Sequence, residues 1–156
     1  MQTNNLHHNR YTLNTGETAV SRAPGEIVCY GLGSCLGVFL YDKFEKVGAA
    51  AHIMLPGDGE WHESDEMLQA IIAGMINLGC HPLIIRARLV GGANIMNLSA
   101  YQIGHRNIVY VKKELKKKGI IVNAEDIGGE ESRTARLDIE SGILSINNSN
   151  KDFYSI

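Results

Sequence analysis

The order of apolar and polar residues predicts three strands in the first part of the chain. Residues 27–30 form an apolar run, and a glycine-rich turn separates this run from a second one at residues 36–41. A third run covers residues 47–55, after a short polar connection at residues 42–45. Apolar segments that are bounded by glycine and polar residues are typical of buried strands. We therefore expect these segments to be consecutive strands of a sheet.

The later part of the chain alternates helical and extended patterns. Apolar residues recur at helical spacing between Met67 and Met75, after a candidate N-cap at Ser64 and before a stop at Gly79. The remaining elements are expected as a helix at 104–118, strands at 83–90 and 120–124, and a hairpin of 136–139 with 143–146. Because the first strands follow one another directly, this order favours a mixed α/β layer structure over a strictly doubly wound sheet.

Composition narrows the class of protein. A length of 156 residues suits one domain, and we expect a flexible polar tail at residues 1–10 followed by a single domain at 11–156. The net charge of −2 argues against a broadly basic nucleic-acid-binding protein. No apolar run approaches the roughly 20 residues that cross a bilayer, and no signal peptide is visible. We expect a cytoplasmic protein that neither binds nucleic acid nor inserts into a membrane.

The three cysteines, Cys29, Cys35 and Cys80, form no CxxC pair, and their number is odd. This usage fits a reducing compartment better than a disulfide framework. A metal site built from Cys80, His81 and His62 is disfavoured because the number and the spacing of its ligands are poor. We expect no metal ion.

The segment Gly31-Leu32-Gly33-Ser34-Cys35 is the best candidate for a chemical site. A dinucleotide-binding loop is disfavoured, because such a loop leads into a helix and this one leads into a predicted strand. Small residues around Cys35 leave room for a substrate carbonyl, and the backbone N–H groups near Gly33 and Ser34 can form an oxyanion site. A free cysteine also commonly packs as a small apolar residue, so Cys35 alone leaves both roles open.

A thiolate nucleophile needs a proton acceptor, and His52 is the candidate. It interrupts the apolar run at residues 47–55, so its ring either finds local hydrogen-bond partners in the core or serves a site. If the two strands form a hairpin centred between Lys43 and Phe44, Cys35 lies directly opposite His52. This register predicts contact between the thiol and the imidazole.

Several motifs in this order resemble the CheD family of chemotaxis proteins. They are Gly33-Ser34-Cys35, Ala51-His52-Ile53-Met54-Leu55-Pro56, Gly91-Gly92-Ala93, Ile103-Gly104-His105-Arg106-Asn107, and Glu125-Asp126-Ile127-Gly128-Gly129 with Arg133 downstream. The resemblance covers roughly residues 25–142. It implies an α/β fold in which mixed sheets form a sandwich-like core with helices packed outside.

The resemblance also implies hydrolytic deamidation of glutamine side chains on the cytoplasmic helices of methyl-accepting chemoreceptors. Cys35 would be the nucleophile of a thioester mechanism and His52 its base, with no cofactor. Cys29 occupies the position at which the family usually has a threonine that orients the histidine. In this chain Cys29 orients His52 less firmly, a backbone carbonyl does so instead, or activity is reduced.

Other interpretations of the same residues stay open. A weakly active or inactive chain would be a binding module that regulates a CheC-type phosphatase, which is also the partner that the resemblance implies. A cysteine peptidase or acyltransferase uses the same pair of residues, and a Cys29–Cys35 disulfide would silence the nucleophile. Asn107 is read as a helix cap, and Glu125 and Asp126 as partners of Arg106 or Arg133.

Overall fold

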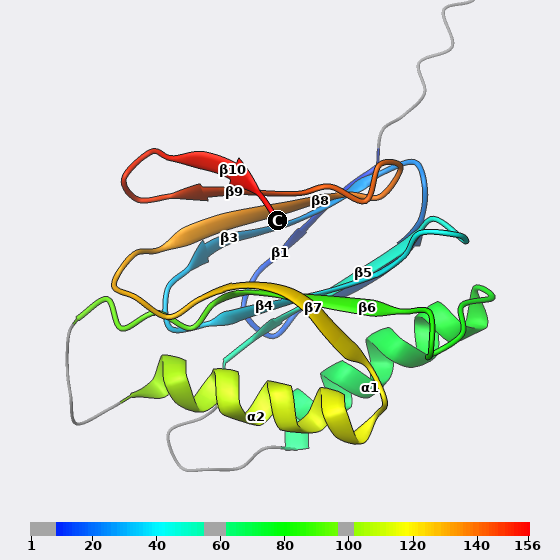
Figure 1. Ribbon diagram of the computed structural model, residues 1–156, viewed down its shortest axis with the longest axis horizontal. Coiled ribbons are helices and arrows are strands. Elements are labelled where there is room, and N and C mark those ends of the chain that lie inside the picture. Colours follow the sequence, from blue (N-terminus) through cyan, green and yellow to red (C-terminus); the bar gives the residue numbers. More distant parts are fainter. Residues whose placement is uncertain (1–8, 55–61, 97–101) are drawn as a thin grey trace, which may run out of the picture.

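The computed structural model describes residues 9–54, 62–96 and 102–156. Within these residues, two five-stranded sheets face each other, and two helices cover the outer face of the second sheet (Figure 1). The first sheet contains, in spatial order, β1 (Arg10–Leu13), β3 (Glu26–Leu32), β8 (Arg133–Asp138), β9 (Leu144–Asn148) and β10 (Phe153–Ser155). The second contains β2 (Thr18–Arg22), β5 (Val47–Ile53), β4 (Leu36–Asp42), β6 (Arg86–Gly91) and β7 (Ile121–Ile127). The helices are α1 (His62–Asn77) and α2 (Ile103–Lys117).

This arrangement confirms the predicted fold class, a mixed α/β domain with a sandwich-like core and helices outside. Neither described helix is both long and apolar enough to span a bilayer. Most of the tail predicted at residues 1–10 lies outside the described residues, and its last residue, Arg10, begins β1.

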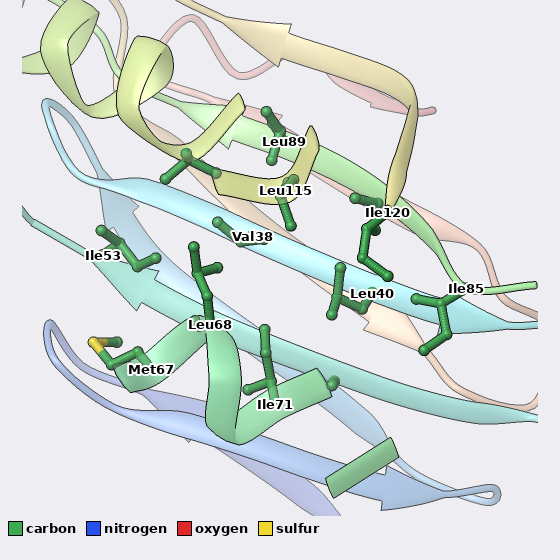
Figure 2. Close-up of a cluster of buried hydrophobic side chains, with 14 of the residues drawn as sticks. Val38, Leu40, Ile53, Met67, Leu68, Ile71, Ile85, Leu89, Leu115 and Ile120 are labelled. Atoms are coloured by element: carbon green, nitrogen blue, oxygen red, sulfur yellow. The ribbon is translucent and has the colours of Figure 1, made fainter. Parts of the chain in front are cut away.

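The second sheet is buried on both faces, which explains the unbroken apolar runs of β4 and β5. On β4, Leu36, Val38 and Leu40 pack against α1 and α2, whereas Phe39 packs between the two sheets. Figure 2 shows the helix-side cluster, in which Leu68 of α1 lies over the sheet. Full burial of one such side chain contributes about 1.5–3 kcal/mol. The same alternation directs every second residue of β4 and β5 toward the space between the sheets.

The hairpin of β4 and β5 differs by two residues from the predicted register. The prediction placed Cys35 opposite His52, but the structure pairs Gly37 with His52. The direct opposition was therefore wrong. Because side chains alternate with a period of two, a shift of two residues in the partner keeps Cys35 and His52 on the same face of the sheet.

The turn between β4 and β5 explains this shift. The buried carboxylate of Asp42 accepts hydrogen bonds from the N–H groups of Phe44 and Glu45, at 2.9 and 3.0 Å. Lys46 takes the left-handed conformation with φ of 49°, and Asp42 pairs with Val47. Short polar side chains stabilise turns in this way, so the turn is centred between Phe44 and Glu45.

Three short strands were not predicted from the sequence. β1, β2 and β10 have between three and five residues, and much of their surface is exposed. Such strands carry too few buried positions for an apolar pattern, and their pairing with neighbouring strands stabilises them. β6 begins at Arg86 rather than at residue 83, because Leu83 belongs to a turn in which its N–H contacts the His81 ring.

Both helices were predicted, but neither of their proposed caps is correct. α1 already includes His62, so Ser64 lies inside its first turn and is buried there. The N-cap position of α2 is Gln102, and Asn107 lies in the second turn of that helix. Asn107 is wholly buried, and its side-chain amide forms a hydrogen bond outside the helix, with the Ser34 carbonyl.

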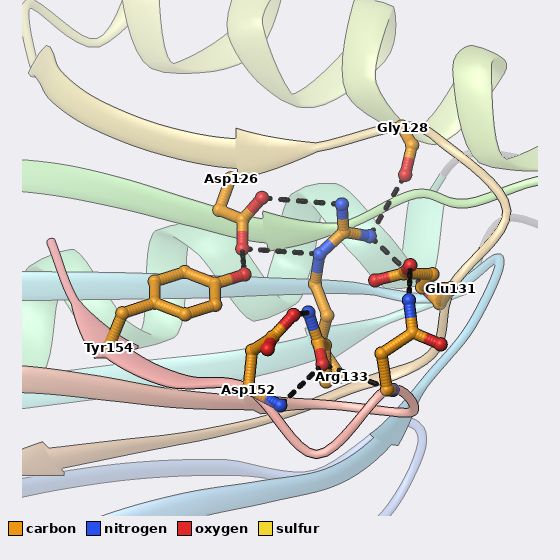
Figure 3. A network of polar contacts seen from close by, with 8 residues as sticks. Asp126, Gly128, Glu131, Arg133, Asp152 and Tyr154 are labelled. Atoms are coloured by element: carbon orange, nitrogen blue, oxygen red, sulfur yellow. Dashed lines mark hydrogen bonds and ion pairs between the residues drawn. The ribbon is translucent and has the colours of Figure 1, made fainter.

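A polar network joins the edge of the second sheet to the first (Figure 3). The guanidinium of Arg133 on β8 contacts both carboxylate oxygens of Asp126 on β7, each at 3.2 Å. It also donates to the carbonyls of Gly128 and Glu131 at 2.9 and 3.1 Å, and the Tyr154 hydroxyl donates to Asp126. The predicted pairing of Asp126 with Arg133 is confirmed, while Glu125 pairs instead with Lys112.

We expect replacement of Arg133 by methionine to destabilise the protein by about 3 kcal/mol, because removing one partner of a buried ion pair leaves the other charge uncompensated. Urea unfolding measures this loss. Arg136→Met on the same strand is the matched control. Its contact with Glu26 is longer, the Arg136 side chain is 42% exposed, and Arg10 still pairs with Glu26 in the variant, so we expect a loss of at most about 1 kcal/mol. Equal losses for the two variants would contradict a structural role for the network.

Candidate active site

Cys35 lies in the loop between β3 and β4, where the chain crosses from the first sheet to the second. Its side chain is 8% exposed and faces a cavity of about 390 Å³. One wall of this cavity is the segment Gly33–Cys35, which we call the nucleophile loop, and residues 93–96 and the start of α2 form the opposite wall. A Cβ atom at Gly33 would lie 2.6 Å from Ile95 Cδ1, so a larger residue there would displace the end of the Ile95 side chain into the cavity mouth. The thiol is thus buried but reachable.

Two donors just after β6 and one on α2 hold the carbonyls of the nucleophile loop. Ala93 N–H donates to the Gly33 carbonyl at 2.8 Å, and Gly92 N–H donates to the Cys35 carbonyl at 2.8 Å. The buried Asn107 amide donates to the Ser34 carbonyl between them at 2.7 Å. The loop is therefore fixed at each of its three residues.

The hydrogen bonds to the Gly33 and Ser34 carbonyls also orient the N–H groups of the next residues, Ser34 and Cys35. In a planar trans peptide, the C=O of one residue and the N–H of the next point in opposite directions. Because the Gly33 and Ser34 carbonyls point toward residue 93 and Asn107, the N–H groups of Ser34 and Cys35 point away from them. Two successive N–H groups beside a nucleophile are the elements of an oxyanion site.

His52 lies on β5 and is 3% exposed. Its Nδ1 atom is 3.0 Å from the carbonyl oxygen of Leu13 on β1, in the facing sheet. A carbonyl only accepts, so Nδ1 carries a hydrogen, and in the neutral imidazole Nε2 carries a lone pair. Nε2 is buried, and no described residue forms a hydrogen bond with it. A fixed tautomer with an unpartnered nitrogen is what a general base requires.

Cys35 and His52 lie on the same inter-sheet face, separated by one residue pair along the hairpin. Diagonal neighbours of this kind are roughly 7–8 Å apart in the backbone, within reach of an imidazole side chain. Among the described contacts, Cys35 Sγ meets the hydroxyl of Thr15 at 3.7 Å rather than the ring of His52. Catalytic hydrogen bonds of this type often tighten only when substrate is bound.

Burial raises the pKa of the Cys35 thiol above its usual value, and hydrogen bonds from Thr15 and from the backbone of Cys35 itself lower it in part. Burial, with a further contribution from the nearby Cys35, raises the pKa of Cys29 to about 12. Both thiols therefore favour the protonated form at neutral pH. A thiolate at Cys35 then depends on an adjacent base.

Cys29 is wholly buried on β3, in the cluster of side chains between the sheets. The residue that contacts His52 Nδ1 is not Cys29 but Leu13, which pairs with Cys29 in the first sheet. Of the three alternatives considered for the histidine, the structure shows the backbone carbonyl. Cys29 and Cys35 are both free thiols in this structure.

Nothing in the sequence pattern indicates Leu13 or Thr15 as site residues, because no strand is predicted before residue 26. A turn signal was present in Asn14-Thr15-Gly16-Glu17, but its place in the fold depends on β1 and β2. Asn107 was identified by its motif and assigned to the wrong role. Among the described residues, no group of three His, Cys, Asp or Glu side chains is arranged to hold a metal ion, and the side chain of His62 lies outside the description.

Comparison with known proteins places the chain in a family. A family model described as CheD chemotactic sensory transduction matches residues 54–148. The chemoreceptor glutamine deamidase CheD of Thermotoga maritima is 38% identical over 136 residues, which cover 84% of this chain and 87% of that protein.

Two further relatives are named as probable chemoreceptor glutamine deamidases CheD. The protein of Thermococcus kodakarensis is 39% identical over 137 residues, or 81% of this chain and 85% of that protein. The protein of Clostridium tetani is 35% identical over 147 residues, or 87% of this chain and 89% of that protein. With a family model over more than half of its length and relatives that match most of it, the chain belongs to the CheD family.

Proposed function

We propose that this protein deamidates glutamine side chains on the cytoplasmic helices of chemoreceptors, with Cys35 as nucleophile and His52 as base. The name of the Thermotoga maritima relative supports the substrate class. The observation that carries the chemistry is the buried, unpartnered Nε2 of His52 on the same face as a cysteine that lines a cavity.

The reaction begins with transfer of the proton from Cys35 Sγ to His52 Nε2. The thiolate attacks the carboxamide carbon of glutamine, and the C=O electron pair moves onto the oxygen. Collapse of this intermediate breaks the C–N bond, and His52 donates its proton to the departing ammonia. Water, deprotonated by His52, then cleaves the thioester to give glutamate and the free thiol.

The negative oxygen of each tetrahedral intermediate is stabilised by the N–H groups of Ser34 and Cys35. These donors are held before substrate binds, since the carbonyls of the nucleophile loop are already hydrogen-bonded. Donors that need no reorganisation lower the barrier, and loss of one such donor costs about 10²–10³ in kcat.

The entrance of the cavity suits a side chain presented by a helix. Ile95 is 49% exposed and Met96 is 76% exposed beside Cys35. Exposed apolar residues around a nucleophile are suited to the apolar positions of a partner surface. We infer that the rim contacts the receptor helix while one glutamine side chain enters the cavity.

Replacing Cys35 with alanine removes the nucleophile, so we expect conversion of Gln to Glu on receptor cytoplasmic fragments to fall by at least about 10³-fold. His52→Gln removes the base, and we expect a fall of about 10²–10⁴-fold. Mass spectrometry of the receptor peptides measures both rates.

The matched control for the nucleophile is Cys80→Ala, because Cys80 is a buried thiol in the cluster beneath the helices, away from the cavity. It is expected to retain activity. Conversion by Cys35→Ala at the wild-type rate would contradict the mechanism. Binding of receptor or of a CheC-type phosphatase by the wild-type protein, without any conversion, would instead favour a binding module.

Asn107→Leu tests the fixed nucleophile loop, because it preserves side-chain size but removes the donor to the Ser34 carbonyl. We expect kcat to fall by about tenfold with little change in KM, since the N–H groups act mainly on the transition state. Steady-state kinetics with receptor fragments measures both constants. Asn123→Leu, at an exposed position on β7, is the control, and an unchanged kcat in Asn107→Leu would refute the role.

A further inference from the structure

The turn between β1 and β2, residues 14–17, lies against His52, the proposed catalytic base. Gly16 N–H donates to the His52 carbonyl at 2.9 Å, and His52 N–H donates to the Glu17 carbonyl at 3.1 Å. The turn is closed by Glu17 N–H on the Asn14 carbonyl at 3.0 Å and by Asn14 N–H on the Glu17 carboxylate at 2.7 Å. Its position relative to His52 is therefore fixed by backbone as well as side-chain bonds.

Thr15 is the second residue of this turn. Its hydroxyl oxygen lies 3.7 Å from Cys35 Sγ. The turn thus contacts both Cys35 and His52. Leu13, the residue just before the turn, also contacts His52, through its carbonyl and the ring Nδ1. Thr15 is an exposed residue, and the contact of its hydroxyl with the sulfur is partly buried.

We propose that Thr15 is a positioning residue for the Cys35 sulfur, and that its hydroxyl donates a hydrogen bond to the thiolate. This inference deepens the proposed function and rests on Cys35 as its nucleophile. In the thiol form, either group donates. In the thiolate form, the sulfur has no hydrogen, so the Thr15 hydroxyl is the donor and its bond becomes charge-assisted.

The bond therefore stabilises the thiolate form of Cys35. It also holds the sulfur in one orientation toward the cavity. It opposes the effect of burial, which favours the neutral thiol. The thiolate is then stabilised at the stage at which it must attack.

Four titratable groups lie next to the turn or to Cys35. They are Cys29 on β3, which interacts with Cys35 electrostatically, His52 on β5, Glu17 in the turn, and Glu63 of α1, whose carboxylate lies near Gly16. A variant at Thr15 leaves all four unchanged. A displaced pH profile for Cys35 then reports the lost hydroxyl.

The test is the rate of Cys35 alkylation by iodoacetamide as a function of pH, followed by mass spectrometry of the peptide that contains Cys35. Thr15→Val keeps the shape of the side chain and removes the hydroxyl. We expect its profile to move to higher pH by about one unit, which is about a tenfold slower reaction at neutral pH. Thr15→Ser keeps the hydroxyl and is expected to follow the wild-type profile.

Thr18→Val is the matched control, because Thr18 is an exposed threonine on β2 that follows the same turn. Thr15→Ala repeats the loss of the hydroxyl without the added methyl group, in case valine disturbs the turn. Wild-type profiles for both Thr15→Val and Thr15→Ala would overturn the inference, as would an equal displacement in Thr18→Val.

Alkylation needs no receptor, so this test separates the inference from the proposed function. If Thr15→Val displaces the profile while the wild-type protein converts no glutamine, Thr15 positions the sulfur and the deamidase proposal fails. If conversion requires Cys35 but neither Thr15 variant displaces the profile, the deamidase proposal stands and the inference on Thr15 fails.

Discussion

The candidate site depends on one hydrogen bond that crosses from sheet to sheet, between His52 Nδ1 and the carbonyl of Leu13. His52 belongs to the second sheet and Leu13 to the edge strand of the first, so the bond forms only when the two sheets are packed together. It selects the tautomer in which Nε2 bears the lone pair, and burial keeps that nitrogen from water. The proposed base is therefore positioned by both sheets rather than by one hairpin.

The proposed nucleophile, Cys35, is held by a different part of the structure. Hydrogen bonds from the two residues after β6 and from α2 hold the three carbonyls of the nucleophile loop, while the turn before β2 contacts the sulfur. The ion pair of Asp126 with Arg133 ties the segment beyond β7 in place, and Gly129 in that segment accepts a hydrogen bond from Asn94 in the wall of the cavity. The site thus lies where both sheets and α2 meet. The first sheet contributes the Leu13 carbonyl, the second contributes His52, and α2 contributes the Asn107 amide.

Local signals in the sequence were sufficient to predict a mixed α/β structure, both helices, most strands and the two side chains that we propose as nucleophile and base. The sandwich-like core was implied by the family resemblance. Apolar runs and glycine punctuation are short-range features, and they indicated the nucleophile loop directly. The register of the hairpin depended on where Asp42 caps its turn, a contact that spacing alone does not determine. Leu13 and Thr15 reach the site from 39 and 20 residues away along the chain, through short strands with no apolar pattern, so only the packed structure brings them there.

The most direct test of the account is the protonation of the His52 ring, which nitrogen-15 NMR reports for each ring nitrogen separately. In the neutral form of the ring, we expect a hydrogen on Nδ1, bonded to the Leu13 carbonyl, and a bare Nε2. A hydrogen on Nε2 in the neutral ring would contradict the account, because the nitrogen assigned to take the Cys35 proton would already carry one.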